Sequence, residues 1–123
     1  MASDKPTASE RFAARMAAID GVKNFVLIRK DGQVITHNLE DPDELAALAT
    51  LCGLQSEAIA GTLGFSQVER LCLRRAGGES LSLFRLDKYF VAVIQEPDCP
   101  LDDLLDRVSK FLSSLRRQNK STA

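Results

Sequence analysis

The sequence is poor in the residues that mark metal sites, disulfide frameworks and membrane spans. Among 123 residues it has no tryptophan, one histidine and three cysteines, Cys52, Cys72 and Cys99. These cysteines are odd in number and widely spaced, whereas disulfide frameworks and zinc sites use clustered, usually paired cysteines. We therefore expect reduced thiols in a cytoplasmic protein, with no metal and no cofactor. Residues 1–10 lack the apolar segment of a secretory signal, and no run approaches the roughly 20 apolar residues of a membrane span.

A strong net charge is also missing, because 16 basic residues face 17 acidic ones. A nucleic-acid-binding protein is usually strongly basic, and electrostatic membrane docking needs a basic cluster beside an apolar face. We expect neither partner. The length and the 45% hydrophobic content fit one globular domain. We place that domain at residues 9–118, after a flexible arm at 1–8 and before a flexible tail at 119–123.

Catalytic motifs are absent too. The sequence contains neither GxxxxGK[ST] nor GxGxxG. His37 has no nucleophile and carboxylate near it in sequence, as a hydrolytic triad would need. Helix starts account for the acidic clusters at 41–44 and 98–103 without a metal. We predict no catalytic residue and no enzyme activity. The arginines at 70, 74, 75 and 85 form either a solvated face or a contact for an anion or an acidic partner.

The hydrophobic pattern predicts an α+β (α/β) domain in the order α-β-β-α-β-β-β-α. Expected helices span 9–19, capped by Ser9, then 42–63, capped by Asp41, and finally 101–118; expected strands span 23–30, 33–38, 67–75, 79–85 and 89–94. Short hairpins imply an antiparallel sheet. The first and last strands are apolar on both faces, which places them side by side in the centre, with the second and third strands at the edges. The two amphipathic helices then cover one face, and the middle helix covers the other.

The middle helix points to a protein partner. Residues 45–54 (LAALATLCGL) carry no charge, so the helix is apolar nearly all round and needs cover on two faces. Small side chains at Ala46, Ala49, Thr50 and Gly53, beside Leu45, would let a second helix approach closely. Either another element of this chain covers that face, or a second copy does. We predict a homodimer with these residues in the interface.

The third strand is expected to add to that interface. A strand at the edge of a sheet can pair with its copy in another chain, which here would involve Val68, Arg70, Cys72 and Arg74. Arginines on an edge strand oppose such pairing, so the sequence gives evidence in both directions.

Several segments resemble roadblock/LC7 domains. In Ile19–Gly32 (IDGVKNFVLIRKDG), "GV" opens the first strand and "DG" turns it, as in that family. An alanine- and leucine-rich helix follows at the family's distance, and Leu63-Gly64 leads into Val68-Glu69-Arg70-Leu71 as at the family's third strand. The resemblance covers Ser9 to Leu115. Asn24 departs from it, since many members have a second glycine there.

The resemblance implies a five-stranded antiparallel sheet with one helix on one face and two on the other. It also implies homodimers, or heterodimers with another roadblock-type chain, formed through the middle helix and the third strand. Such domains regulate small Ras-like GTPases, including those of bacterial gliding, without supplying a catalytic residue. On this chain the GTPase would contact Glu44, Ala47, Leu51 and Gln55. The alternative is a ligand-sensing or signalling adaptor domain without a GTPase partner, which would need a cavity with converging polar groups.

Overall fold

The computed structural model describes residues 7–66, 68–74, 78–97 and 100–122, and only the backbone of Leu101 and of residues 116–122. Its elements are α1 (Ala8–Ala17), β1 (Val22–Arg29), β2 (Val34–His37), α2 (Asp43–Thr62), β3 (Arg70–Arg74), β4 (Ser80–Leu86), β5 (Tyr89–Gln95) and α3 (Leu101–Thr122). The order α-β-β-α-β-β-β-α is therefore confirmed.

The five strands form one antiparallel sheet in the order β2-β1-β5-β4-β3, as predicted. The two all-apolar strands, β1 and β5, lie together in its centre and pair from Arg29 opposite Tyr89 to Val22 opposite Gln95. The hairpin turns also match the prediction. Gly32 (φ +95°) closes the first turn, and Asp87 (φ +54°) lies in the two-residue turn between β4 and β5.

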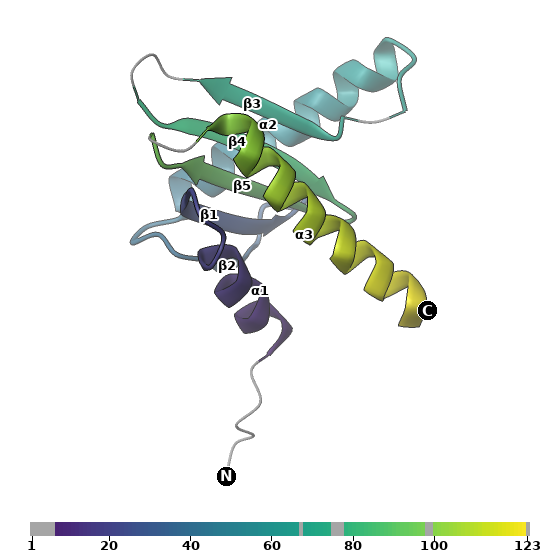
Figure 1. Cartoon of the computed structure of the whole chain (residues 1–123). Helices are drawn as coiled ribbons and strands as arrows, with labels where there is room; N and C mark the ends of the chain where they lie inside the picture. The colour runs from purple at the N-terminus through teal and green to yellow at the C-terminus, as the bar shows by residue number, and fades with distance from the viewer. Residues whose placement is uncertain (1–6, 67, 75–77, 98–99, 123) are drawn as a thin grey trace.

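Helices cover both faces of the sheet, with α2 behind it and α1 and α3 in front in Figure 1. The front core unites Phe12 and Met16 of α1 with the buried stripe of α3 and with Phe25 and Val93 of the sheet. The back core is smaller and unites Ala46 and Ala49 of α2 with the sheet. One helix on one face and two on the other is the predicted arrangement.

The ends of several elements differ from the sequence prediction. The hydroxyl of Thr7, and not that of Ser9, caps α1 by accepting the N–H of Glu10 at 3.1 Å. Pro42 holds the N-cap position of α2, and Asp41 instead accepts the N–H of Asp43 at 3.1 Å. Each difference is a shift of one or two residues, because several neighbouring side chains are suited to capping.

Two further boundaries affect the predicted segments. β3 is shorter than expected, so Val68 precedes the strand. α3 continues to Thr122 and thus includes most of the predicted tail, while α1 begins within the predicted arm at Ala8. Residues 1–6 lie outside the described part of the chain.

Candidate protein-interaction surface

The small residues of α2 face the chain's own sheet. Ala46, Ala49, Gly53 and Ala60 are the buried residues of this helix. A Cβ built on Gly53 would lie 2.5 Å from Cζ of Phe90, so only glycine allows the helix to approach β5 this closely. The expectation that this face lies open to a second helix is therefore wrong, since the sheet covers it. Three predicted interface residues, Ala46, Ala49 and Gly53, are inaccessible for that reason.

The large apolar side chains of α2 face outward instead. Four of them, together with two residues that follow the helix, form what we call the α2 surface and are between 44% and 67% exposed: Leu48, Leu51, Leu54 and Ile59, then Leu63 and Phe65. A helix that packs on a sheet with alanine and glycine leaves its leucines for the opposite side. An apolar surface of this kind, exposed along a whole helix, is typical of a binding site.

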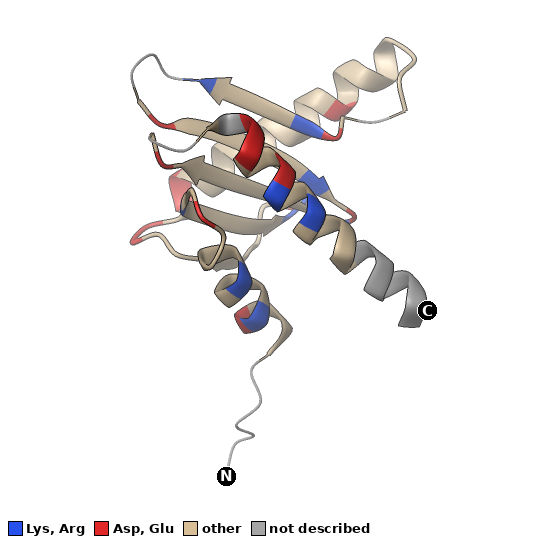
Figure 2. Ribbon diagram, viewed as in Figure 1, with Lys and Arg blue, Asp and Glu red and all other residues tan. Residues whose placement is uncertain are grey.

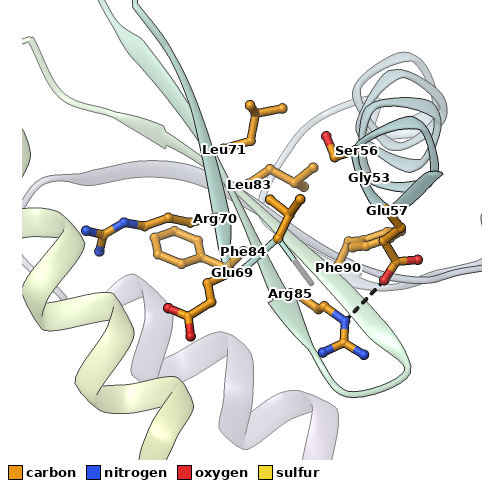
Figure 3. Close-up of a pocket in the computed structure, with 11 residues that line it drawn as sticks. Gly53, Ser56, Glu57, Glu69, Arg70, Leu71, Leu83, Phe84, Arg85 and Phe90 are labelled. Carbon is orange, nitrogen blue, oxygen red and sulfur yellow. Dashed lines mark hydrogen bonds and ion pairs between the residues drawn. The ribbon is translucent and has the colours of Figure 1, made fainter. Parts of the chain in front are cut away.

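The α2 surface carries no charge. Between Leu45 and Ser66 the only charged residue is Glu57, and it turns toward the sheet. Its carboxylate accepts hydrogen bonds from Lys30 Nζ at 2.8 Å and from Arg85 Nε at 3.1 Å, the latter drawn in Figure 3. The Lys30 hydrogen bond lowers the pKa of Glu57 from the ordinary value of 4.5, and partial burial opposes this. Figure 2 accordingly shows α2 almost entirely without charged residues along its length.

The edge strand β3 has two different sides. Leu71 packs into the core beneath α2, whereas Cys72 packs against the core on the opposite face. In Figure 3 Arg70 and Phe84 lie on one side of the β3–β4 pair, while Leu71 and Leu83 turn to the other. Arg70 and Arg74 are exposed at the two ends of β3, where Figure 2 shows basic residues. Leu73, on the α2 side, is 50% exposed.

The structure separates the other predicted residues. The four predicted GTPase contacts, Glu44, Ala47, Leu51 and Gln55, are all exposed and follow one line along the outer side of α2. Leu45 is half-buried against the back core. The hydroxyl of Thr50 donates to the Ala46 carbonyl at 2.7 Å, which satisfies it within the helix. The arginines at 70 and 74 are not brought together with Arg85, which contacts Glu57. Arg75 lies outside the described residues.

The α2 face of the sheet has an open hollow of about 480 Å³, which is lined by Leu45, Leu73, Arg74, Glu79, Ser80, Leu81 and Ile94. Between α2 and the β3–β4 pair the structure leaves a volume of only about 10 Å³, shown in Figure 3, which is room for one water. His37 accepts the N–H of Leu39 through Nδ1 at 3.0 Å. In the described ranges, no three His, Cys, Asp or Glu side chains gather in a way that could hold a metal. Gly77, Asp98 and Cys99 fall outside those ranges. No described helix is both long and apolar enough to cross a bilayer.

Sequence reasoning missed part of the surface. The charge-free run 45–54 included Leu48, Leu51 and Leu54, but the prediction did not extend to Ile59, Leu63 or Phe65. Once the small residues are assigned to the sheet, the helical period of 3.6 places these large side chains on the outer face or at the end of the helix. The structure leaves Leu48 53% exposed, whereas Leu45 is half-buried.

Comparison of the whole fold with solved structures gives consistent matches. Myxococcus xanthus MglB matches with a TM-score of 0.82 at 18% identity, over 99% of this chain and 97% of that one. An MglB structure with a tetrameric arrangement gives 0.76 at 18% identity, over 97% and 96%. A roadblock/LC7 domain from Streptomyces avermitilis gives 0.73 at 18% identity, over 87% and 92%. The chain has the roadblock/LC7 fold.

In this fold α2 lies on one face of the sheet and β3 forms an edge of it. No protein-family model matches the sequence, and no curated protein sequence matches it either. The roadblock/LC7 assignment thus depends on three-dimensional similarity and on the order of the short motifs.

Proposed function

We propose that this protein is a non-catalytic interaction module that forms a homodimer through α2 and β3 and regulates a small Ras-like GTPase. The observation that carries the proposal is the α2 surface, where large apolar side chains are exposed along the helix. Between Leu45 and Ser66 the one charged side chain, Glu57, is turned away from this surface and toward the sheet. Burying such a surface contributes roughly 25 cal/mol for each Å² of apolar area. The roadblock/LC7 fold of the chain and the tetrameric arrangement of a similar MglB support self-association.

The edge strand supports a specific register for the dimer. β3 reads RLCLR, the same in both directions. In one antiparallel pairing of two copies, all five residues of β3 take part and both α2 helices lie on the same face of the joined sheet. This pairing places Cys72 opposite the partner's Cys72. Leu71 then meets Leu73, which continues the apolar surface across the two copies. Arg70 meets Arg74, and these like charges weaken the pairing without preventing it.

The GTPase would bind the outer line of α2, through Glu44, Ala47, Leu51 and Gln55. Each of these is exposed, and two copies related by a dyad would offer the line twice. Among the described residues no three His, Cys, Asp or Glu side chains gather in a way that could hold a metal. We expect an effect on GTP hydrolysis to come from changing the shape of the GTPase, as the family resemblance implies.

The first experiment is the native mass by light scattering over a hundredfold dilution. We expect twice the chain mass of 13.5 kDa, with a dimer that persists into the micromolar range. A monomer at all concentrations would refute the homodimer and would favour a roadblock-type heterodimer partner.

The second experiment is single-turnover GTP hydrolysis by a panel of Ras-like GTPases, with and without the dimer. We expect binding that prefers the GTP form of at least one of them. Glu44→Ala and Gln55→Ala should raise the concentration of dimer needed for half of its effect and leave the rate at saturation within about twofold, because they remove contacts and no catalytic group. A loss of rate at saturation would contradict the non-catalytic role. If no GTPase binds, the regulatory role is refuted while the dimer stands.

A further inference from the structure

A groove of about 520 Å³ lies on the face of the sheet opposite α2. It runs between α1 and the C-terminal half of α3, which lie on the same face in Figure 1. Its floor and walls are mainly apolar: Phe12, Leu27, Ile35, Leu86, Phe111 and Leu115. Sites for small organic ligands usually measure roughly 300–1,000 Å³ and combine apolar walls with a few polar groups. This groove has the dimensions of such a site.

The groove is built into the main core. Phe12, Leu27, Leu86 and Phe111 each belong to the front core and still expose 7% of their surface. The tilted rings of Phe12 and Phe111 pack with their centroids 5.4 Å apart, which fixes the wall between the two helices. No lining residue belongs to α2 or β3. The groove would therefore stay open in the proposed dimer.

One cation is held at this apolar surface. The guanidinium carbon of Arg15 lies 4.7 Å from the centroid of the Phe111 ring, and Arg15 also lines the groove. This cation–π contact attracts the guanidinium to the face of the ring, and the group has five N–H donors. Within the described part of the chain no carboxylate pairs with Arg15. A planar guanidinium with available donors matches the two oxygens of a carboxylate.

The charge of the lining limits the ligand further. Arg15 contributes a positive charge to the lining and Asp87 a negative one, while Arg11 has an interaction of its own. A ligand with a single negative charge suits this lining, since Arg15 would attract that charge and Asp87 would repel a second one. Ser9 and Tyr89 supply additional polar groups at the groove.

We infer that this groove binds an amphipathic organic monocarboxylate, whose aliphatic or aromatic body lies on the apolar floor while its carboxylate pairs with Arg15. The site is separate from the α2 surface. A small acid bound in the groove would thus occupy one face of the sheet, while the α2 surface on the other face binds protein partners.

Octanoate is the probe, and methyl-resolved NMR titration of the full chain is the measurement. We expect saturable shifts at Leu27, Ile35, Leu86 and Leu115, with octanoate binding at least tenfold more tightly than octanol or octyltrimethylammonium. Equal binding of the three probes, or shifts centred on Leu51 and Leu54, would overturn the inference, because a site built around Arg15 must distinguish charge and location.

Two variants test the two parts of the site. Arg15→Gln should weaken octanoate about tenfold, whereas Arg29→Gln, an equally charge-removing change on an exposed arginine outside the groove, should leave it unchanged. Leu115→Trp should fill the groove and abolish binding. If that variant fails to unfold cooperatively, Arg15→Gln decides alone. An unchanged affinity in Arg15→Gln would refute the pairing.

The same titration separates this inference from the proposed dimer. Leu48→Glu, which is designed to produce a monomer, should bind octanoate with the wild-type affinity. Loss of octanoate binding in that variant would contradict a groove formed by α1, α3 and the sheet of one chain.

Discussion

Gly53 of α2 lies directly against the ring of Phe90 in β5, so the helix and the sheet touch where the helix has no side chain. A Cβ at this position would come within 2.5–2.7 Å of three ring atoms. Phe90 is only 2% exposed, and its ring is packed in the back core. This contact determines which side of α2 packs inward and therefore which side presents its leucines to a partner.

Gly53→Ala should destabilise the protein. Alanine improves helix propensity by about 1 kcal/mol, but the clash with a fully packed ring costs about 1–3 kcal/mol or forces the helix away from the sheet. We expect a net loss of roughly 1–2 kcal/mol in the free energy of unfolding, measured by guanidinium denaturation.

Gly61→Ala is the matched control on the same helix. Nothing lies within 4 Å of a Cβ at residue 61, so only the propensity gain remains. We expect a stabilisation of about 0.5–1 kcal/mol. If Gly53→Ala stabilised the protein as much as Gly61→Ala does, the close approach of α2 to β5 would be incorrect.

Glu57 should make stability depend on pH in the acidic range. The hydrogen bond from Lys30 lowers the pKa of Glu57 below 4.5 in the folded protein. The stabilisation is therefore present above the unfolded-state pKa and is lost as the pH falls through the lower, folded-state pKa. We expect Glu57→Gln to reduce the free energy of unfolding by about 1 kcal/mol at pH 7, a modest value because the group is partly exposed.

The difference between wild type and Glu57→Gln should shrink as the pH falls below 4.5, because the wild-type carboxyl is then increasingly neutral as well. Urea denaturation at pH 7, 5, 4 and 3 measures it. Glu40→Gln, on an exposed carboxylate, serves as the control and should show no such convergence. A constant difference between wild type and Glu57→Gln from pH 7 to pH 3 would exclude the pairing with Lys30.

Leu48→Glu should convert the dimer to a monomer. Leu48 is 53% exposed in the single chain and belongs to the α2 surface, outside the line of residues that the GTPase would bind. A buried interface would have to desolvate the new carboxylate, at a cost of several kcal/mol for each copy. We expect at least a hundredfold weaker dimer by sedimentation, with unchanged thermal unfolding of the monomer. Ala14→Glu, on an exposed position of α1, should leave the dimer intact.

The sequence predicted the sheet because the two all-apolar runs, 25–28 and 90–94, can only be central strands when both faces are covered. It also predicted that the middle helix has more apolar surface than one face of the sheet can cover. It did not predict which side of that helix packs inward. Leucine and alanine are both apolar, and the choice between them depends on the approach permitted by Gly53 over Phe90, a contact between residues far apart in sequence.

The ionic contacts and the groove were equally beyond the sequence. Lys30, Glu57 and Arg85 come from a turn, a helix and a strand, and nothing in their spacing links them. The groove depends on the angle between α1 and α3, which side-chain packing sets after the sheet has formed. The inward positions looked uniformly aliphatic, yet Arg15 reaches the groove from the outer side of α1 by lying over Phe111.

The register of the proposed β3 pair can be tested with a disulfide. Opposed residues in an antiparallel pair have Cα atoms about 4.5–5.5 Å apart, which lies within the range of roughly 4.4–6.8 Å that a disulfide spans. If Cys72 faces the partner's Cys72, mild oxidation of a Cys52→Ala, Cys99→Ala protein should yield a covalent dimer of twice 13.5 kDa on a non-reducing gel. Cys72→Ser in the same background should yield none, and Leu48→Glu should suppress the product.

Salt should accelerate this cross-linking, because the register brings Arg70 opposite the partner's Arg74 twice. The screening length falls from about 10 Å at 0.1 M salt to about 3 Å at 1 M, so the repulsion between exposed guanidinium groups weakens while apolar burial on the α2 side does not. Arg70→Gln should give a faster reaction at low salt and a smaller response to added salt. A covalent dimer that forms equally fast at every ionic strength, in both proteins, would mean that these arginines do not face each other and that β3 pairs in another register.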